Sequence, residues 1–83
     1  MELQVGRAYR AKKPAQAGSF LNSYYNDRQI LWMSGDGSIV QYDGPAVGHG
    51  RKYPKVTREA FEKWASHDVT DQLPESSWQR WDK

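Results

Sequence analysis

Alternation of hydrophobic and polar positions predicts short β-strands in the first two thirds of the chain. Within residues 7–12, Tyr9 and Ala11 share one side of an extended segment, while Arg10 and Lys12 share the other. This two-residue period is typical of a half-buried strand.

Residues 14–26 lack such a period and are predicted to form a loop. The segment carries the aromatic residues Phe20, Tyr24 and Tyr25. It is long for a structureless connection, so we expect it either to pack on the domain or to act as a binding loop.

The clearest hairpin signal lies in the middle of the chain. Residues 28–33 and 38–42 are predicted strands, and Ser34-Gly35-Asp36-Gly37 between them suits a tight turn because Asp and Gly tolerate positive φ. Apolar residues occur on both faces of this pair. We therefore expect a central hairpin that is covered on each side, with Trp32 in the core.

A fourth strand is predicted over residues 51–56. It is expected at an edge of the sheet because Pro54 has no N–H to donate. If the strand is regular, Arg51, Tyr53 and Lys55 project from one face.

One helix is predicted over residues 58–66, with Thr57 as its N-cap. Phe61 and Trp64 belong to an apolar stripe at helical spacing and are expected in the core. Residues 68–70 are predicted to add a short strand after the helix.

Composition shows how such a small domain could be stabilised. Leu, Ile, Val and Phe together number only 13, but four Trp and five Tyr add apolar area. The 12 basic and 10 acidic residues leave a net charge of +2. A folded domain with an aromatic-rich core is therefore expected rather than a disordered chain.

The predicted fold class is α+β, with small antiparallel sheets or a partly open SH3-like barrel of about four to five strands and one helix in the C-terminal third. The 83 residues are expected to form a single small domain. Its ordered core would span about 5–70, and residues 71–83 form a tail that could dock through Trp78 and Trp81.

Several kinds of chemistry are not predicted. The chain has no cysteine, and His49 and His67 show no metal-ligand spacing, so neither a metal site nor a cofactor is expected. Asp36 and Asp43 fit turns rather than an acid–base pair, so an enzyme is not predicted. The sequence contains neither a signal-peptide pattern nor an apolar run of about 20 residues, so no membrane association is expected and a cytoplasmic location is predicted.

Two kinds of macromolecular partner are considered. Aromatic residues are typical interface anchors, and the candidate protein-binding residues are Phe20, Tyr24, Tyr25, Trp78 and Trp81. Interleaved cations and rings can also bind nucleic acid, and the candidates for that contact are Arg10, Lys12, Arg51, Tyr53 and Lys55. Edge strands use Lys and Arg to prevent aggregation, which is a simpler explanation for the second set. Binding to protein is the first prediction and binding to nucleic acid is the alternative.

Short segments of the sequence resemble those of two groups of proteins. The segment from Val5-Gly6 through Tyr9-Arg10-Ala11-Lys12-Lys13-Pro14 is similar to the first strand of small SH3-like barrels. Four further segments resemble parts of small hypothetical proteins that are encoded in bacteriophages and prophages. They are residues 26–32, 40–45, 50–54 and 61–70. This second resemblance implies a two-sheet antiparallel α+β domain with one C-terminal helix, encoded by a phage-derived gene of unknown role, and it implies no catalytic residues. Because the chain shows no catalytic pattern, a non-catalytic phage or prophage accessory protein that acts through protein contacts is predicted.

Overall fold

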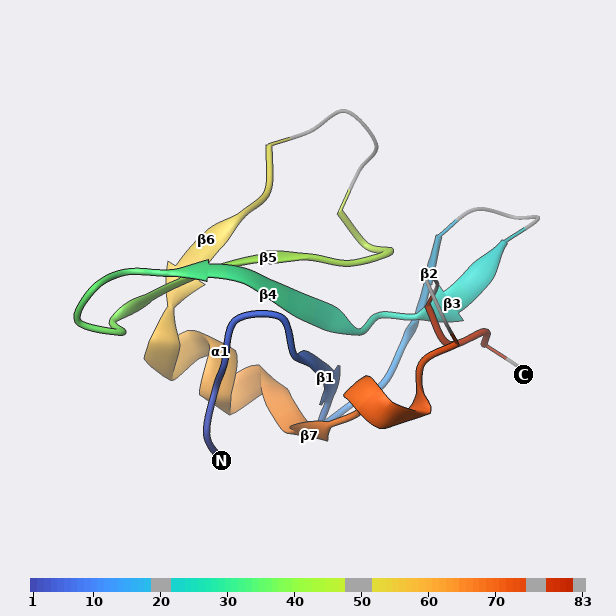
Figure 1. The fold of residues 1–83 in the computed structure, drawn as a ribbon. Coiled ribbons are helices and arrows are strands. Elements are labelled where there is room, and N and C mark those ends of the chain that lie inside the picture. Colours follow the sequence, from blue (N-terminus) through green and yellow to red (C-terminus); the bar gives the residue numbers. More distant parts are fainter. Residues whose placement is uncertain (19–21, 48–51, 75–77, 82–83) are drawn as a thin grey trace.

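The computed structural model describes residues 1–18, 22–47, 52–74 and 78–81. Its architecture is α+β, as predicted, with a five-stranded antiparallel sheet, a separate two-stranded sheet and one helix in the C-terminal third (Figure 1). The elements are β1 (Ala8–Ala11), β2 (Gln16–Gly18), β3 (Ser23–Tyr25), β4 (Arg28–Met33), β5 (Ile39–Asp43), β6 (Lys55–Thr57), α1 (Arg58–Trp64), β7 (Ala65–Asp68) and a 3-10 turn at Thr70–Gln72.

The large sheet has the strand order β6-β5-β4-β1-β7, and α1 lies across one of its faces (Figure 1). The core forms between the helix and this inner face of the sheet. Its buried members are Leu3, Tyr9, Ile30, Val40, Phe61 and Ala65. The central hairpin β4-β5 occurs at the predicted position, with the turn between Ser34 and Ile39 closed by a bond from the Ser34 N–H to the Ile39 carbonyl.

Helix α1 begins as predicted, because the Thr57 hydroxyl accepts a hydrogen bond from the Ala60 N–H at 3.1 Å. Phe61 is fully buried, and its ring contacts those of Tyr9, Tyr42 and Trp64 with centroid separations between 5.2 and 6.0 Å. Trp64 is half-buried and packs against the core.

The helix is shorter than predicted and ends at Trp64. The next residues, Ala65–Asp68, form β7 and pair antiparallel with β1. Pairing with the edge of the sheet thus replaces the last helical turn, and the strand predicted at residues 68–70 occurs three residues earlier.

The prediction that the central hairpin is covered on both faces is wrong. A register shift between Ile30 and Trp32 places Ile30 opposite Tyr42 and Met33 opposite Val40. Ile30 and Met33 therefore both face the core although they are three residues apart, and the bulge turns Trp32 to the outer face. Trp32 is 43% exposed, which corrects its predicted core position.

The strand predicted at residues 51–56 is also shorter, and β6 covers only Lys55–Thr57. Its position at the edge of the large sheet agrees with the prediction from Pro54. Arg51 lies outside the described residues. Tyr53 precedes the strand and is 48% exposed.

The segment predicted as a loop contains a hairpin, formed by β2 and β3. Gly18 adopts φ +96, and a side chain there would collide with the carbonyl of Asn22, so this glycine is required for the close approach of the two strands. The C-terminal segment adds to the hairpin through bonds from the Tyr25 N–H to Gln79 O and from the Trp81 N–H to Ser23 O, each 3.0 Å.

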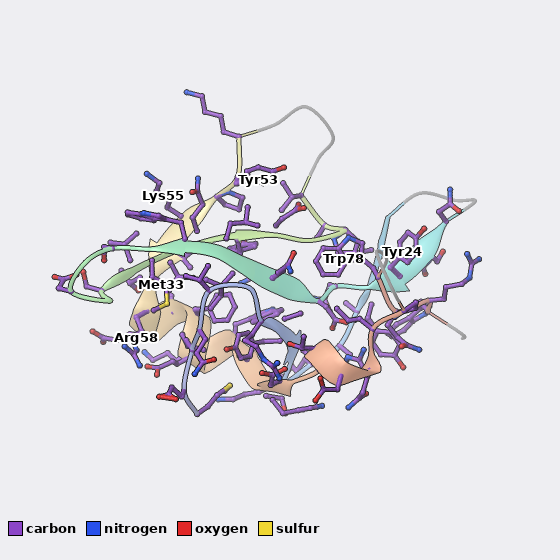
Figure 2. The ribbon with its side chains drawn as sticks, in the orientation of Figure 1. Tyr24, Met33, Tyr53, Lys55, Arg58 and Trp78 are labelled. Atoms are coloured by element: carbon purple, nitrogen blue, oxygen red, sulfur yellow. The ribbon has the colours of Figure 1, made fainter. Side chains whose placement is uncertain are left out.

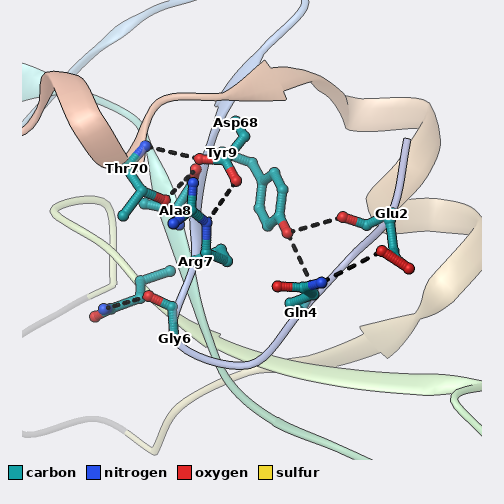
Figure 3. Close-up of polar contacts among 9 residues, drawn as sticks. Glu2, Gln4, Gly6, Arg7, Ala8, Tyr9, Asp68 and Thr70 are labelled. Atoms are coloured by element: carbon teal, nitrogen blue, oxygen red, sulfur yellow. Dashed lines mark hydrogen bonds and ion pairs between the residues drawn. The ribbon is translucent and has the colours of Figure 1, made fainter.

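Polar contacts hold the N-terminal arm against the sheet (Figure 3). The buried Tyr9 hydroxyl donates to Glu2 O and accepts from the Gln4 N–H. Arg7 pairs with Asp68 at 2.8 Å, and the Ala8 N–H donates to Thr70 Oγ1. These contacts join the N-terminal segment to residues 68–70 across β1 and β7.

Across the described ranges, the structure contains no helix with the length and apolar character needed to span a bilayer.

Candidate functional site

A group of large exposed side chains lies on the outer face of β4, β5 and β6. Leu31, Trp32 and Tyr53 are 37%, 43% and 48% exposed. Trp32 lies beside Gln41 and Lys55, and Tyr53 lies beside Gln41. We call these five residues the open sheet face. Contiguous apolar groups of this kind on a small domain are typical of contact surfaces.

Strand pairing positions this group. Trp32 lies opposite Gln41, and Gln41 lies opposite Lys55. The Lys55 Nζ is 5.0 Å from the centroid of the Trp32 ring, and the Gln41 amide donates to the Tyr53 carbonyl at 3.2 Å. These contacts connect Trp32, Lys55, Gln41 and Tyr53, and Leu31 precedes Trp32 in the same strand.

The open sheet face lies opposite the helix. Figure 2 shows Tyr53 and Lys55 projecting away from α1, whereas Met33 and Arg58 lie on the α1 side. Sequence reasoning proposed Tyr53 and Lys55 as candidates but missed Leu31 and Trp32. A β-bulge inside an unbroken apolar run has no distinct sequence signal. The apolar run at residues 30–33 therefore suggested that Leu31 and Trp32 are buried.

The predicted basic pair on the first strand is separated in the structure. The Arg10 side chain forms two hydrogen bonds to Asp27, each 3.0 Å, and its guanidinium carbon lies 3.9 Å from the Tyr25 ring centroid. Asp27 is fully buried and Arg10 is only 12% exposed. Lys12 is exposed and lines a different surface with Trp64.

The candidate aromatic interface is largely occupied by contacts within the chain. Tyr25 and Trp81 meet edge to face with their centroids 4.9 Å apart, and Tyr24 forms a β-bridge with Arg80. Tyr24, Tyr25, Trp78 and Trp81 are all half-buried. Phe20, the fifth candidate, lies outside the described residues.

Two hollows lie close to the rings that Arg28 contacts. One, of about 230 Å³, is lined by Ala11, Lys12, Lys13, Lys63 and Trp64. The other, of about 220 Å³, is lined by Asp27, Arg28, Tyr42, Gly44, Ala46, Val47, Lys52 and Pro54. Arg28 connects them because its guanidinium carbon lies 4.1 Å from the Trp64 ring centroid and 4.4 Å from that of Tyr42.

The shifted pKa values are explained by local contacts. Burial raises the pKa of Tyr9 and lowers that of Arg28. Burial acts to raise the pKa of Asp68, but hydrogen bonds from Arg7 and Thr70 outweigh it and the pKa is lowered. Bonds from Ser38 and Ser34 lower the pKa of Asp36 to about 2.

The described part of the chain shows no cluster of three or more His, Asp or Glu side chains that could hold a metal ion.

Comparisons of the chain with protein-family models, with curated proteins and with solved structures found no match. Function is therefore inferred from the geometry of the surface.

Proposed function

We propose that this protein is a non-catalytic interaction module that binds another protein through the open sheet face. The observation that carries the proposal is the exposure of Trp32 and Tyr53, which Gln41 and Lys55 link on the face of the large sheet away from α1, with Leu31 exposed next to Trp32 in β4. Trp and Tyr are the residue types that contribute most to protein interfaces, because each buries a large rigid area at small cost in side-chain entropy.

The chemistry of the face indicates the kind of partner. Lys55 is its charged residue and lies beside the Trp32 ring. A partner that covers the two rings with an apolar side chain and places a carboxylate near Lys55 would match the face in both shape and charge.

Binding of nucleic acid at this same face is the alternative, and one contact disfavours it. The Lys55 Nζ occupies the space over the Trp32 ring where a base would stack. A base would first have to displace this cation from the ring.

The biological setting proposed for the module follows from the resemblance at residues 26–32 and 61–70. We place it among small phage or prophage accessory proteins that act in the cytoplasm. The identity of the neighbouring genes tests this setting independently of the binding surface.

Site-specific photo-crosslinking tests the protein-binding proposal. A photoreactive phenylalanine replaces Trp32 or Tyr53 in the full chain, and the control carries it at Ala60, which is exposed on α1. We expect positions 32 and 53 to give the same discrete protein adduct in host cells, and position 60 to give none.

The adduct protein is then purified and titrated against unlabelled variants. Trp32→Ala and Tyr53→Ala should each weaken its binding at least about tenfold, whereas Glu59→Ala on α1 should leave it unchanged. Equal crosslinking from all three positions, adducts that nuclease removes, or full affinity in both aromatic variants would contradict the proposal.

A further inference from the structure

A second surface, on different residues, combines cations with aromatic rings. It consists of Lys12, Lys13, Lys63, Arg28 and Lys52, which we call the cationic strip. The first three line one hollow with Trp64, and the other two line the second hollow with Tyr42. The strip is continuous because Arg28 lies over both rings.

Within the described ranges, no ion pair includes a member of this strip. The ion pairs there join Arg7 to Asp68, Arg10 to Asp27 and Arg58 to Glu62. Asp27 lines the second hollow, but both of its carboxylate oxygens accept bonds from Arg10. Its charge is thus already balanced by a cation outside the strip.

Arg28 is held in a way that suits an oxyanion. Its flat guanidinium lies over two aromatic rings, which leaves the in-plane N–H donors available. A phosphate group can accept two such bonds at once. Burial lowers the pKa of Arg28, and an anion in the adjacent hollow would offset that cost.

We propose that the cationic strip binds the phosphate backbone of a single-stranded nucleic acid. Five cations along two concave hollows fit a flexible strand whose phosphates pair with Lys and Arg. A duplex is stiff over about 150 base pairs and cannot follow two hollows on a domain whose longest extent is 39 Å.

Titration with oligonucleotides tests the proposal on the full chain. The probe is an oligothymidylate of about 12 nucleotides, followed by amide chemical shifts at several salt concentrations. The double variant Lys12→Ala/Lys63→Ala is compared with Lys55→Ala/Arg80→Ala, which removes the same charge outside the strip. Each variant is first shown to fold by its amide spectrum.

We expect the strip variant to bind about tenfold more weakly and its salt slope to fall by about 1.4, or about 0.7 for each phosphate that the variant no longer neutralises. The control variant should keep both values close to those of the wild type. Arg28→Lys, which keeps the charge but not the planar fork, should weaken binding, and the largest shifts should fall at Trp64, Tyr42 and their neighbours.

Four outcomes would overturn the proposal. They are the absence of shifts at low salt, an equal loss of affinity in the control variant, equally tight binding of poly-glutamate, and tighter binding of a duplex of the same length. The two proposals use different residues, because Lys55 belongs to the open sheet face and not to the cationic strip. A negative result with oligonucleotides therefore leaves the protein-binding proposal intact, and a negative result in the crosslinking experiment leaves the nucleic-acid proposal intact.

Discussion

The ion pair between Arg10 and Asp27 shows how one buried charge is tolerated in a domain this small. Asp27 is fully buried, both of its oxygens accept hydrogen bonds from Arg10, and Tyr25 covers the guanidinium. An unpaired carboxylate in that position would carry a large desolvation cost. Sequence reasoning placed Arg10 on an exposed strip because strand alternation shows which side a residue faces, but not what covers that side.

Replacing Asp27 tests whether the pair stabilises the fold. Asp27→Ala leaves Arg10 buried without a partner, so we expect the free energy of unfolding to fall by about 3–5 kcal/mol. The double variant Arg10→Met/Asp27→Leu removes both charges and should recover most of that loss. Urea unfolding followed by circular dichroism measures both values. A single variant as stable as the wild type would show that the pair contributes nothing.

At the scale of elements, prediction succeeded where a local signal determines the structure. Thr57 starts α1 through its hydroxyl, and residues 34–37 form the predicted turn between β4 and β5. Prediction failed where the structure depends on pairing between residues that are far apart in the sequence. The end of α1 depends on pairing between β7 and β1, and the β2-β3 hairpin is completed by residues 79–81. Neither partner can be identified from the local pattern.

The turn between β4 and β5 also has an electrostatic component. Asp36 Oδ1 accepts hydrogen bonds from the Ser34 hydroxyl, the Ser38 hydroxyl and the Ser38 N–H, at 2.8 to 3.0 Å. These bonds favour the ionised carboxylate and lower its pKa from 3.8 to about 2. The charged form therefore stabilises the folded turn.

The pH dependence of stability tests this turn. Because the folded pKa lies below the unfolded one, the contribution of Asp36 is fully present above pH 3.8 and is lost as the pH falls through about 2. We expect Asp36→Asn to be less stable than the wild type at neutral pH, and the difference to shrink between these two pH values. Urea unfolding over this pH range measures the difference in the free energy of unfolding. Asp71→Asn, which also removes an exposed carboxylate, is the control variant. A difference that stays constant or grows would contradict the assignment.

The whole molecule has a helix-covered sheet and, beside it, a smaller unit built from β2, β3 and residues 78–81 (Figure 1). The outer face of the large sheet stays open at β4, β5 and β6. The α+β class could be predicted because it follows from counting strands and one helix signal. The open sheet face and the cationic strip could not be predicted, because they depend on which strands are neighbours and on the bulge beside Trp32.

The contact between Trp81 and Tyr25 joins the C-terminal segment to this smaller unit, and it gives the last prediction. Trp81→Ala removes the edge-to-face ring pair, so we expect a loss of about 1–3 kcal/mol in the stability of the unit. The amide of Tyr25, which donates to Gln79 O, should then exchange with solvent faster, while that of Ile30, which donates to Arg7 O, should not change. Trp32→Ala removes an equal side chain from the open sheet face and should leave the Tyr25 amide protected. Equal acceleration of the Tyr25 and Ile30 amides in Trp81→Ala would show instead that the smaller unit and the large sheet unfold as one.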